Sequence, residues 1–174
     1  MLVPFELRPD IPLEGWSAKE HGLEHSEHVD EHLRRVAREG AFPLVLPDHL
    51  PNTHLALTLG ELARDAGEER HTAMHRAIFD ARYGRGRDIG SRDVLLDVAA
   101  SQGFDTRDVE RAWDELSYDQ RLGQFRNLAR YLGIAATPAA LVCNELIIGS
   151  RPYQVLTEAL DRCMVTPESV AEES

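Results

Sequence analysis

From Thr53 to Gly133, apolar residues recur at helical spacing almost without a break, and this pattern requires a fold with a large helical part. Glycines and turn residues divide the stretch into helices near 53–66, 68–82, 91–102 and 105–116, followed by a longer helix that ends before Gly133. We expect their apolar faces to form one compact core. Its predicted members include Leu59, Met74, Phe79, Leu95, Trp113, Leu116 and Leu128.

Other patterns precede and follow this helical block. Residues 2–7 alternate and predict a short strand, residues 17–39 predict a helix, and three prolines within 41–52 exclude a regular element there. After the block, 139–143 and 146–148 predict a two-stranded hairpin, and Pro152 favours the start of a last helix. The predicted parts are a leading strand and loop (1–16), a helical domain (17–133), a strand–strand–helix part (134–165) and a frayed tail (166–174).

The composition excludes several classes of partner. Of 174 residues, 19 are Lys or Arg and 30 are Asp or Glu, which gives a formal net charge of −11. Such a surface repels phosphate backbones and anionic headgroups, so we expect neither a nucleic acid nor a membrane as partner. No apolar run is long enough for a membrane span and no signal-peptide pattern is found, which predicts a cytoplasmic protein. Lys19 is the only lysine, which is typical of a GC-rich bacterial genome.

Several short motifs, in the same order along the chain, resemble the FrnE-like branch of the DsbA family. Pro4–Asp10 (PFELRPD) resembles the PFELNPD sequence that follows the second strand of that family. The other matching segments are Pro51–Thr53, Ala77–Ala81, Asp88–Gly90, Val94–Leu95, Gly133–Ala139 and Gly149–Pro152. The resemblance implies an α/β thioredoxin-like fold of the DsbA type with a large all-helical insertion. In that reading, 1–16 and 134–165 are thioredoxin parts and 17–133 is the insertion.

The resemblance also implies thiol–disulfide exchange on protein or small-molecule thiols, without a cofactor. Family members carry a strand, a Cys-Pro-x-Cys turn and a helix before the PFEL motif, and this sequence begins after that segment. The reactive cysteine of such a turn lies at a helix N-terminus, where its thiolate is stabilised. Cys143 and Cys163 form neither a Cys-x-x-Cys nor a zinc pattern, and we expect two partly buried free thiols. The chain as given is therefore predicted to be redox-inactive.

Three origins would explain the absence of the Cys-Pro-x-Cys segment from this sequence. The coding start is misplaced and a Cys-x-x-Cys lies upstream, or the chain is a degenerate paralogue, or it was shortened deliberately. A degenerate chain would expose an open sheet edge and pair there with a partner chain or with itself as a homodimer. Two other functions remain: a glutathione-dependent isomerase of the 2-hydroxychromene-2-carboxylate type, which needs a serine at the same absent turn, or a non-catalytic binding or dimerising remnant.

Thr137 and Pro138 are the predicted substrate-binding residues. The segment Gly133–Ala139 resembles the family loop whose proline is cis and whose preceding backbone pairs with an extended protein or peptide substrate. The resemblance therefore implies a cis Thr137–Pro138 bond. The alternative is a proline that begins an ordinary strand.

Histidines and arginines form two further candidate clusters. His21, His25, His28 and His32 are spaced by four, three and four residues, which would place them on one stripe of a helix. Such a stripe can share a Zn²⁺ or Ni²⁺ ion, but a solvated helix face is the favoured interpretation, and no metal is predicted. The arginines at 82, 85, 87 and 92 are expected to balance nearby aspartates on the surface.

Overall fold

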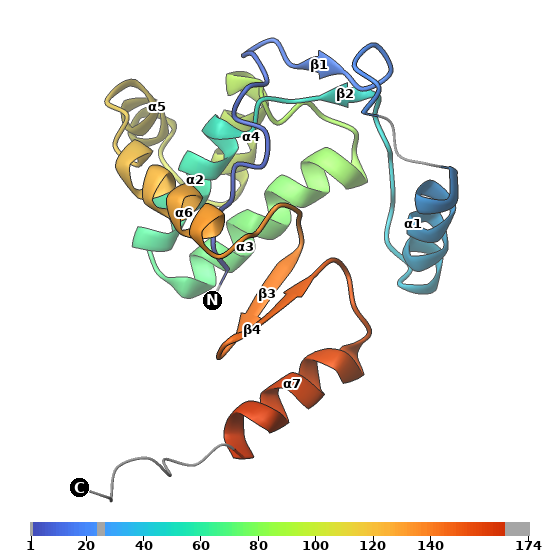
Figure 1. Cartoon of the computed structure of the whole chain (residues 1–174). Coiled ribbons are helices and arrows are strands. Elements are labelled where there is room, and N and C mark those ends of the chain that lie inside the picture. Colours follow the sequence, from blue (N-terminus) through green and yellow to red (C-terminus); the bar gives the residue numbers. More distant parts are fainter. Residues whose placement is uncertain (1, 24–26, 166–174) are drawn as a thin grey trace, which may run out of the picture. The chain divides into compact units, whose positions relative to one another are not determined.

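The computed structural model describes residues 2–23 and 27–165 (Figure 1). It divides into two compact units, Met1–Arg126 and Asn127–Ser174, and the boundary lies within the last helix of the helical block. The helices of the block are α2 (His54–Asp65), α3 (Glu68–Phe79), the short π-helix η1 (Asp80–Gly84), α4 (Arg92–Ser101), α5 (Thr106–Asp114) and α6 (Asp119–Tyr131). The helical order predicted after Thr53 is therefore confirmed.

Helices α2 to α5 enclose the core of the first unit. Helix α2 packs against α3, α4 and α5. The side chains of Leu59, Met74 and Leu95 are fully buried between these helices. Trp113 packs into the same core, and its indole N–H donates to the carbonyl of Leu55 at 3.1 Å, so its one polar atom is satisfied.

Three predicted core residues are instead exposed. Phe79 is 51% exposed, Leu116 59% and Leu128 51%. The Phe79 ring lies along the surface of α3 and η1, with ring centroids 4.6 Å from His75 and 5.8 Å from Tyr83. Leu116 belongs to the turn after α5, where its φ of +53° ends the helix before the apolar period is complete.

A buried ion network joins α2 to α6 within the first unit. The carboxylate of Glu61 is 1% exposed and accepts from Arg64 Nε at 2.9 Å and from Arg121 Nη1 at 3.1 Å. Arg121 Nη1 also donates to Asp65 at 2.8 Å, and the hydroxyl of Tyr118 donates to Asp65 at 3.0 Å. Burial and the bond to the Asp65 carboxylate raise the pKa of Tyr118 to about 12. The network therefore fixes the start of α6 against α2.

The segments before α2 depart from the prediction. The expected strand at 2–7 does not form, because the described chain offers it no ladder partner. Helix α1 spans only Glu27–Glu39, and residues 24–26 of the expected helix lie outside the described residues. Within the proline-rich loop, β2 (His49–Leu50) pairs with β1 (Trp16–Ser17) in an antiparallel bridge that sequence reasoning excluded. Both segments are only two residues long, too short to produce a periodic signal.

The second unit contains the hairpin of β3 (Ala139–Val142) and β4 (Glu145–Ile148), followed by α7 (Tyr153–Val165). Helix α7 contacts β3. These elements were predicted, although β3 ends one residue earlier and β4 begins one residue earlier than expected. No helix in the described part of the chain is long and apolar enough to cross a membrane.

Candidate functional site

The loop between α6 and β3 carries the residues predicted to bind substrate. Helix α6 ends in a Schellman motif, in which Gly133 has a φ of +72° and the amide of Ile134 donates to the carbonyl of Ala129 at 2.8 Å. The chain then reaches the Thr137–Pro138 peptide bond, which is cis, as predicted. Both of these residues are exposed, so this end of the hairpin is open to solvent.

The register of the hairpin determines which backbone groups of β3 are free. Ala140 lies opposite Ile147, and the amide of Gly149 donates to the carbonyl of Pro138 at 2.8 Å. Along an antiparallel ladder, hydrogen-bonded pairs alternate with non-bonded pairs. The residues of β3 between the bonded positions, Ala139 and Leu141, therefore direct their N–H and C=O groups away from β4.

That second edge of β3 has no partner strand among the described residues, since β3 pairs with β4 alone. The edge begins directly after Pro138, and the Leu141 side chain on it is 51% exposed. A free edge of this kind can accept an extended segment through main-chain hydrogen bonds. The arrangement can therefore bind a strand without any change in the β3–β4 ladder.

The two cysteines form a disulfide, and the prediction of free thiols was wrong. Cys143 is the first residue of the hairpin turn and Cys163 lies in α7, with their Cα atoms 6.1 Å apart. The two cysteines are 20 residues apart in the sequence, and this spacing gave no sign that they are close in space. Their proximity depends on how α7 folds back along the hairpin. Neither sulfur lies at a helix N-terminus.

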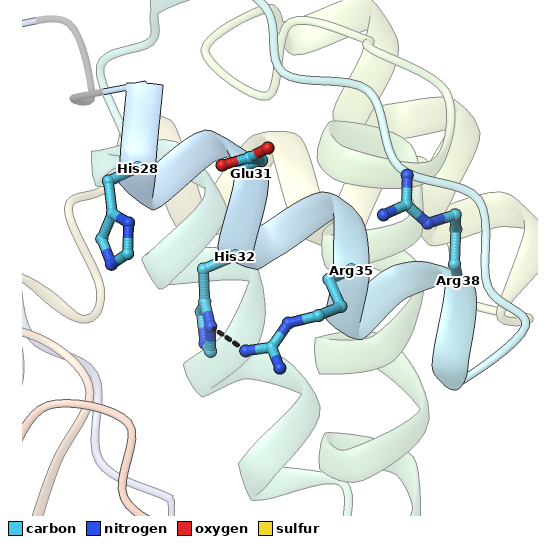
Figure 2. Close-up of a pocket in the computed structure, with 5 residues that line it drawn as sticks. All are labelled: His28, Glu31, His32, Arg35 and Arg38. Carbon is cyan, nitrogen blue, oxygen red and sulfur yellow. Dashed lines mark hydrogen bonds between the residues drawn. The ribbon is translucent and has the colours of Figure 1, made fainter.

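The histidines do not form the predicted stripe. His21 lies in a turn before α1, where Nδ1 is 3.0 Å from the carbonyl oxygen of Ser17, and His25 lies outside the described residues. Among the described histidines, His28 and His32 share α1, where they line a pocket of about 280 Å³ together with Glu31, Arg35 and Arg38 (Figure 2). Arg35 donates to His32 Nδ1 at 2.9 Å, so this ring nitrogen already has a cationic partner. Within residues 2–23 and 27–165, no three His, Cys, Asp or Glu side chains are arranged so that they could hold a metal ion.

The predicted arginine cluster is dispersed. Arg85 pairs with Asp80 at 2.8 Å and Arg87 with Asp97 at 2.7 Å, as expected of surface charge balance. Arg92 pairs with Asp114 of α5, which is 22 residues away along the chain and so is not one of the nearby aspartates that were expected. Arg82, by contrast, is 6% exposed and donates to the carbonyl of His49, so its assignment to the surface was wrong.

Sequence reasoning missed a histidine–carboxylate cluster in the first unit. His54, at the start of α2, has Nδ1 3.2 Å from Glu6 Oε1 and Nε2 3.2 Å from Asp119 Oδ1. Arg126 Nη1 donates to the other Glu6 oxygen at 3.0 Å. The hydrogen bond to Glu6 is the main reason that the pKa of His54 is raised, and the same bond lowers the pKa of Glu6. The partners are 48 and 65 residues from His54, so no local motif reveals them.

A family model for the DSBA-like thioredoxin domain matches residues 1–161, nearly the whole of the chain. The protein is a member of this family, and the predicted α/β thioredoxin-like fold class is confirmed.

One solved structure with the same fold is the selenomethionine form of a 2-hydroxychromene-2-carboxylate isomerase. It has a TM-score of 0.70 and 18% sequence identity to this chain, over 88% of this chain and 78% of that one. At this identity the likeness shows a shared fold. No curated protein sequence matches the chain.

Proposed function

We propose that the protein binds an extended protein or peptide segment, such as a thiol substrate, along the free edge of β3 beside Thr137 and Pro138. The observation that carries the proposal is the outward direction of the Ala139 and Leu141 backbone groups, on an edge that no described strand covers. Membership of the DSBA-like family supports it, because thioredoxin folds use this loop for substrate pairing. The Pro4–Asp10 motif favours the FrnE-type branch, and the near absence of lysine favours a bacterial source, in which we propose a cytoplasmic location.

We further propose that this polypeptide binds without catalysing thiol–disulfide exchange. Its sequence holds no Cys-x-x-Cys, and neither Cys143 nor Cys163 lies at a helix N-terminus that would stabilise a thiolate. In an insulin-reduction assay with dithiothreitol, we expect turbidity to develop at the rate of buffer alone. Turnover that disappears when either cysteine is changed to serine would contradict this. The isomerase alternative has only the shared fold in its favour.

The binding proposal is tested by Leu141→Pro. Proline removes the N–H that points to the free edge while leaving the Ala140–Ile147 bonds of the β3–β4 ladder in place. We expect this variant to bind carboxamidomethylated insulin B chain at least about tenfold more weakly than the unsubstituted protein in isothermal titration calorimetry, a loss of about 1.4 kcal/mol. The alkylated peptide has no free thiol, so only strand pairing is measured.

Leu141→Val is the matched control, because it shortens the side chain and keeps the backbone N–H. We expect its affinity for the peptide to stay within about twofold of the unsubstituted protein. Equal binding by the proline and valine variants would show that the edge is not the binding surface. Light scattering on the same samples separates the partner alternatives: a dimer that Leu141→Pro converts to monomer would show that a second copy occupies the edge.

A further inference from the structure

The Cys143–Cys163 disulfide is accessible to solvent at both ends. Cys143 is exposed in the two-residue turn between β3 and β4, where its φ is +51°, and Cys163 is partly exposed on α7. The Cα–Cα distance of 6.1 Å lies within the usual range for a disulfide. A bridge in this position can be reached by a small thiol while the rest of the chain stays folded.

Within the described residues, few side chains between α7 and the hairpin are fully buried. Ile147 of β4 and Ala159 of α7 are buried, and Val155 and Leu156 of α7 are half-buried. Towards the end of α7, Leu160 is 50% exposed and Met164 81%. The ion pair between Arg162 and Glu145, at 2.7 Å, joins two exposed side chains, and such pairs contribute little. The covalent bridge is therefore the strongest connection between the end of α7 and the hairpin turn.

We propose that this disulfide is a reversible redox clamp, opened by low-molecular-weight thiols, that controls the docking of α7. A thiolate of the reductant attacks Sγ of Cys143, the more exposed of the two residues, and the bond to Cys163 breaks, leaving a Cys163 thiolate that takes up a proton. A second thiolate then attacks the reductant's sulfur in the mixed disulfide and releases Cys143. Two reductant thiols become one disulfide, and two electrons pass to the protein.

This role goes beyond the proposed binding function. Cys143 follows the end of β3 that lies farther from Pro138, since the four residues Ala139–Val142 separate them. The clamp therefore acts at the turn end of the hairpin, and the substrate loop lies at the other end. If the protein binds no peptide, the proposal of a clamp still stands. If the disulfide proves not to be a clamp, the proposal of peptide binding still stands.

The clamp is tested on the full chain by hydrogen–deuterium exchange before and after reduction. With dithiothreitol and no denaturant, we expect intact mass spectrometry to show two maleimide additions, against none before reduction. Amide exchange should then rise at least about tenfold in Tyr153–Val165 and remain unchanged in α2 to α5. The double variant Cys143→Ser/Cys163→Ser should match the reduced protein without any reductant.

Arg162→Gln supplies the control, because it removes the ion pair to Glu145 and keeps the bridge. We expect α7 in this oxidised variant to exchange as slowly as in the unsubstituted protein. The proposal is overturned if maleimide labels the untreated protein, if reduction requires denaturant, or if reduction leaves exchange in α7 unchanged. It is also overturned if Arg162→Gln loosens α7 as much as reduction does.

Discussion

Glu61→Ala is expected to lower the free energy of unfolding of the helical unit by about 3 kcal/mol. Removing one member of a buried ion pair leaves charged partners without compensation, at a cost of roughly 3 to 5 kcal/mol. Here Arg64 is 21% exposed and Arg121 is 37% exposed, so water partly solvates both guanidinium groups after the change. The expected loss therefore lies at the lower end of that range.

Urea denaturation followed by tryptophan fluorescence measures this loss, because Trp113 is buried in the same unit. Asp108→Asn is the matched control: Asp108 pairs with Arg111 at 2.8 Å, but both side chains are more than half exposed. We expect the control to cost less than about 1 kcal/mol. A Glu61→Ala variant as stable as this control would show that the network between α2 and α6 does not support the fold.

The helical unit was predictable because its signals are local. The spacing of Leu59, Met74 and Leu95 identifies buried helix faces, and Asp105 caps α5 by accepting from the Arg107 amide at 2.9 Å. The same periodicity cannot distinguish an apolar residue that faces the core from one that lies at the end of a helix, beyond the core. For this reason the exposure of Phe79 was not predicted.

The candidate site was only partly predictable, because most of it depends on distant contacts. The Thr137–Pro138 loop was found through a family resemblance, and apolar runs bounded by a turn indicated the hairpin. The Cys143–Cys163 bridge depends on how α7 returns to the hairpin, which no local pattern encodes. The pairing of Glu6 with His54 likewise joins segments 48 residues apart.

The predicted strand at 2–7 is a case in which a local pattern predicted an element that depends on a distant partner. Its alternation is genuine, but a strand also requires a neighbour, and the described residues provide none. The segment is instead held by side chains: Arg64 donates to the carbonyl of Leu2, and Glu6 is bound by His54 and Arg126. The histidine–carboxylate cluster thus replaces a β-ladder as the attachment of the N-terminal segment.

His54→Gln is therefore expected to destabilise the first unit by about 2 kcal/mol near pH 5.5, since hydrogen bonds between charged groups contribute roughly 1.5 to 3 kcal/mol. When His54 is protonated, each ring nitrogen donates to a carboxylate, one on Glu6 and one on Asp119. The glutamine side chain carries no charge and cannot bond both carboxylates in this way. Arg126 remains as the cation beside Glu6.

The effect should depend on pH in a defined direction. The pKa of His54 is raised above 6.5, chiefly by its hydrogen bond to Glu6, so its stabilisation is complete below 6.5 and is lost as pH rises through the folded-state pKa. The pKa of Glu6 is lowered below 4.5 by the same bond, so its contribution is lost as pH falls through that lowered value. Burial lowers the pKa values of His71 and His75, which destabilises the fold as pH falls below 6.5.

His71 and His75 affect the pH dependence of stability in the opposite direction to His54, and in the same pH range. The stability of the unsubstituted protein alone therefore cannot give the contribution of the histidine–carboxylate cluster. The difference in unfolding free energy between the unsubstituted protein and His54→Gln removes their contribution, since both proteins contain them. We expect this difference, from urea titrations at pH 5 to 9, to be largest below pH 6.5 and to shrink steadily above it. A difference that is constant with pH would mean that His54 acts by packing alone, and that the imidazolium does not hold Glu6 to α2.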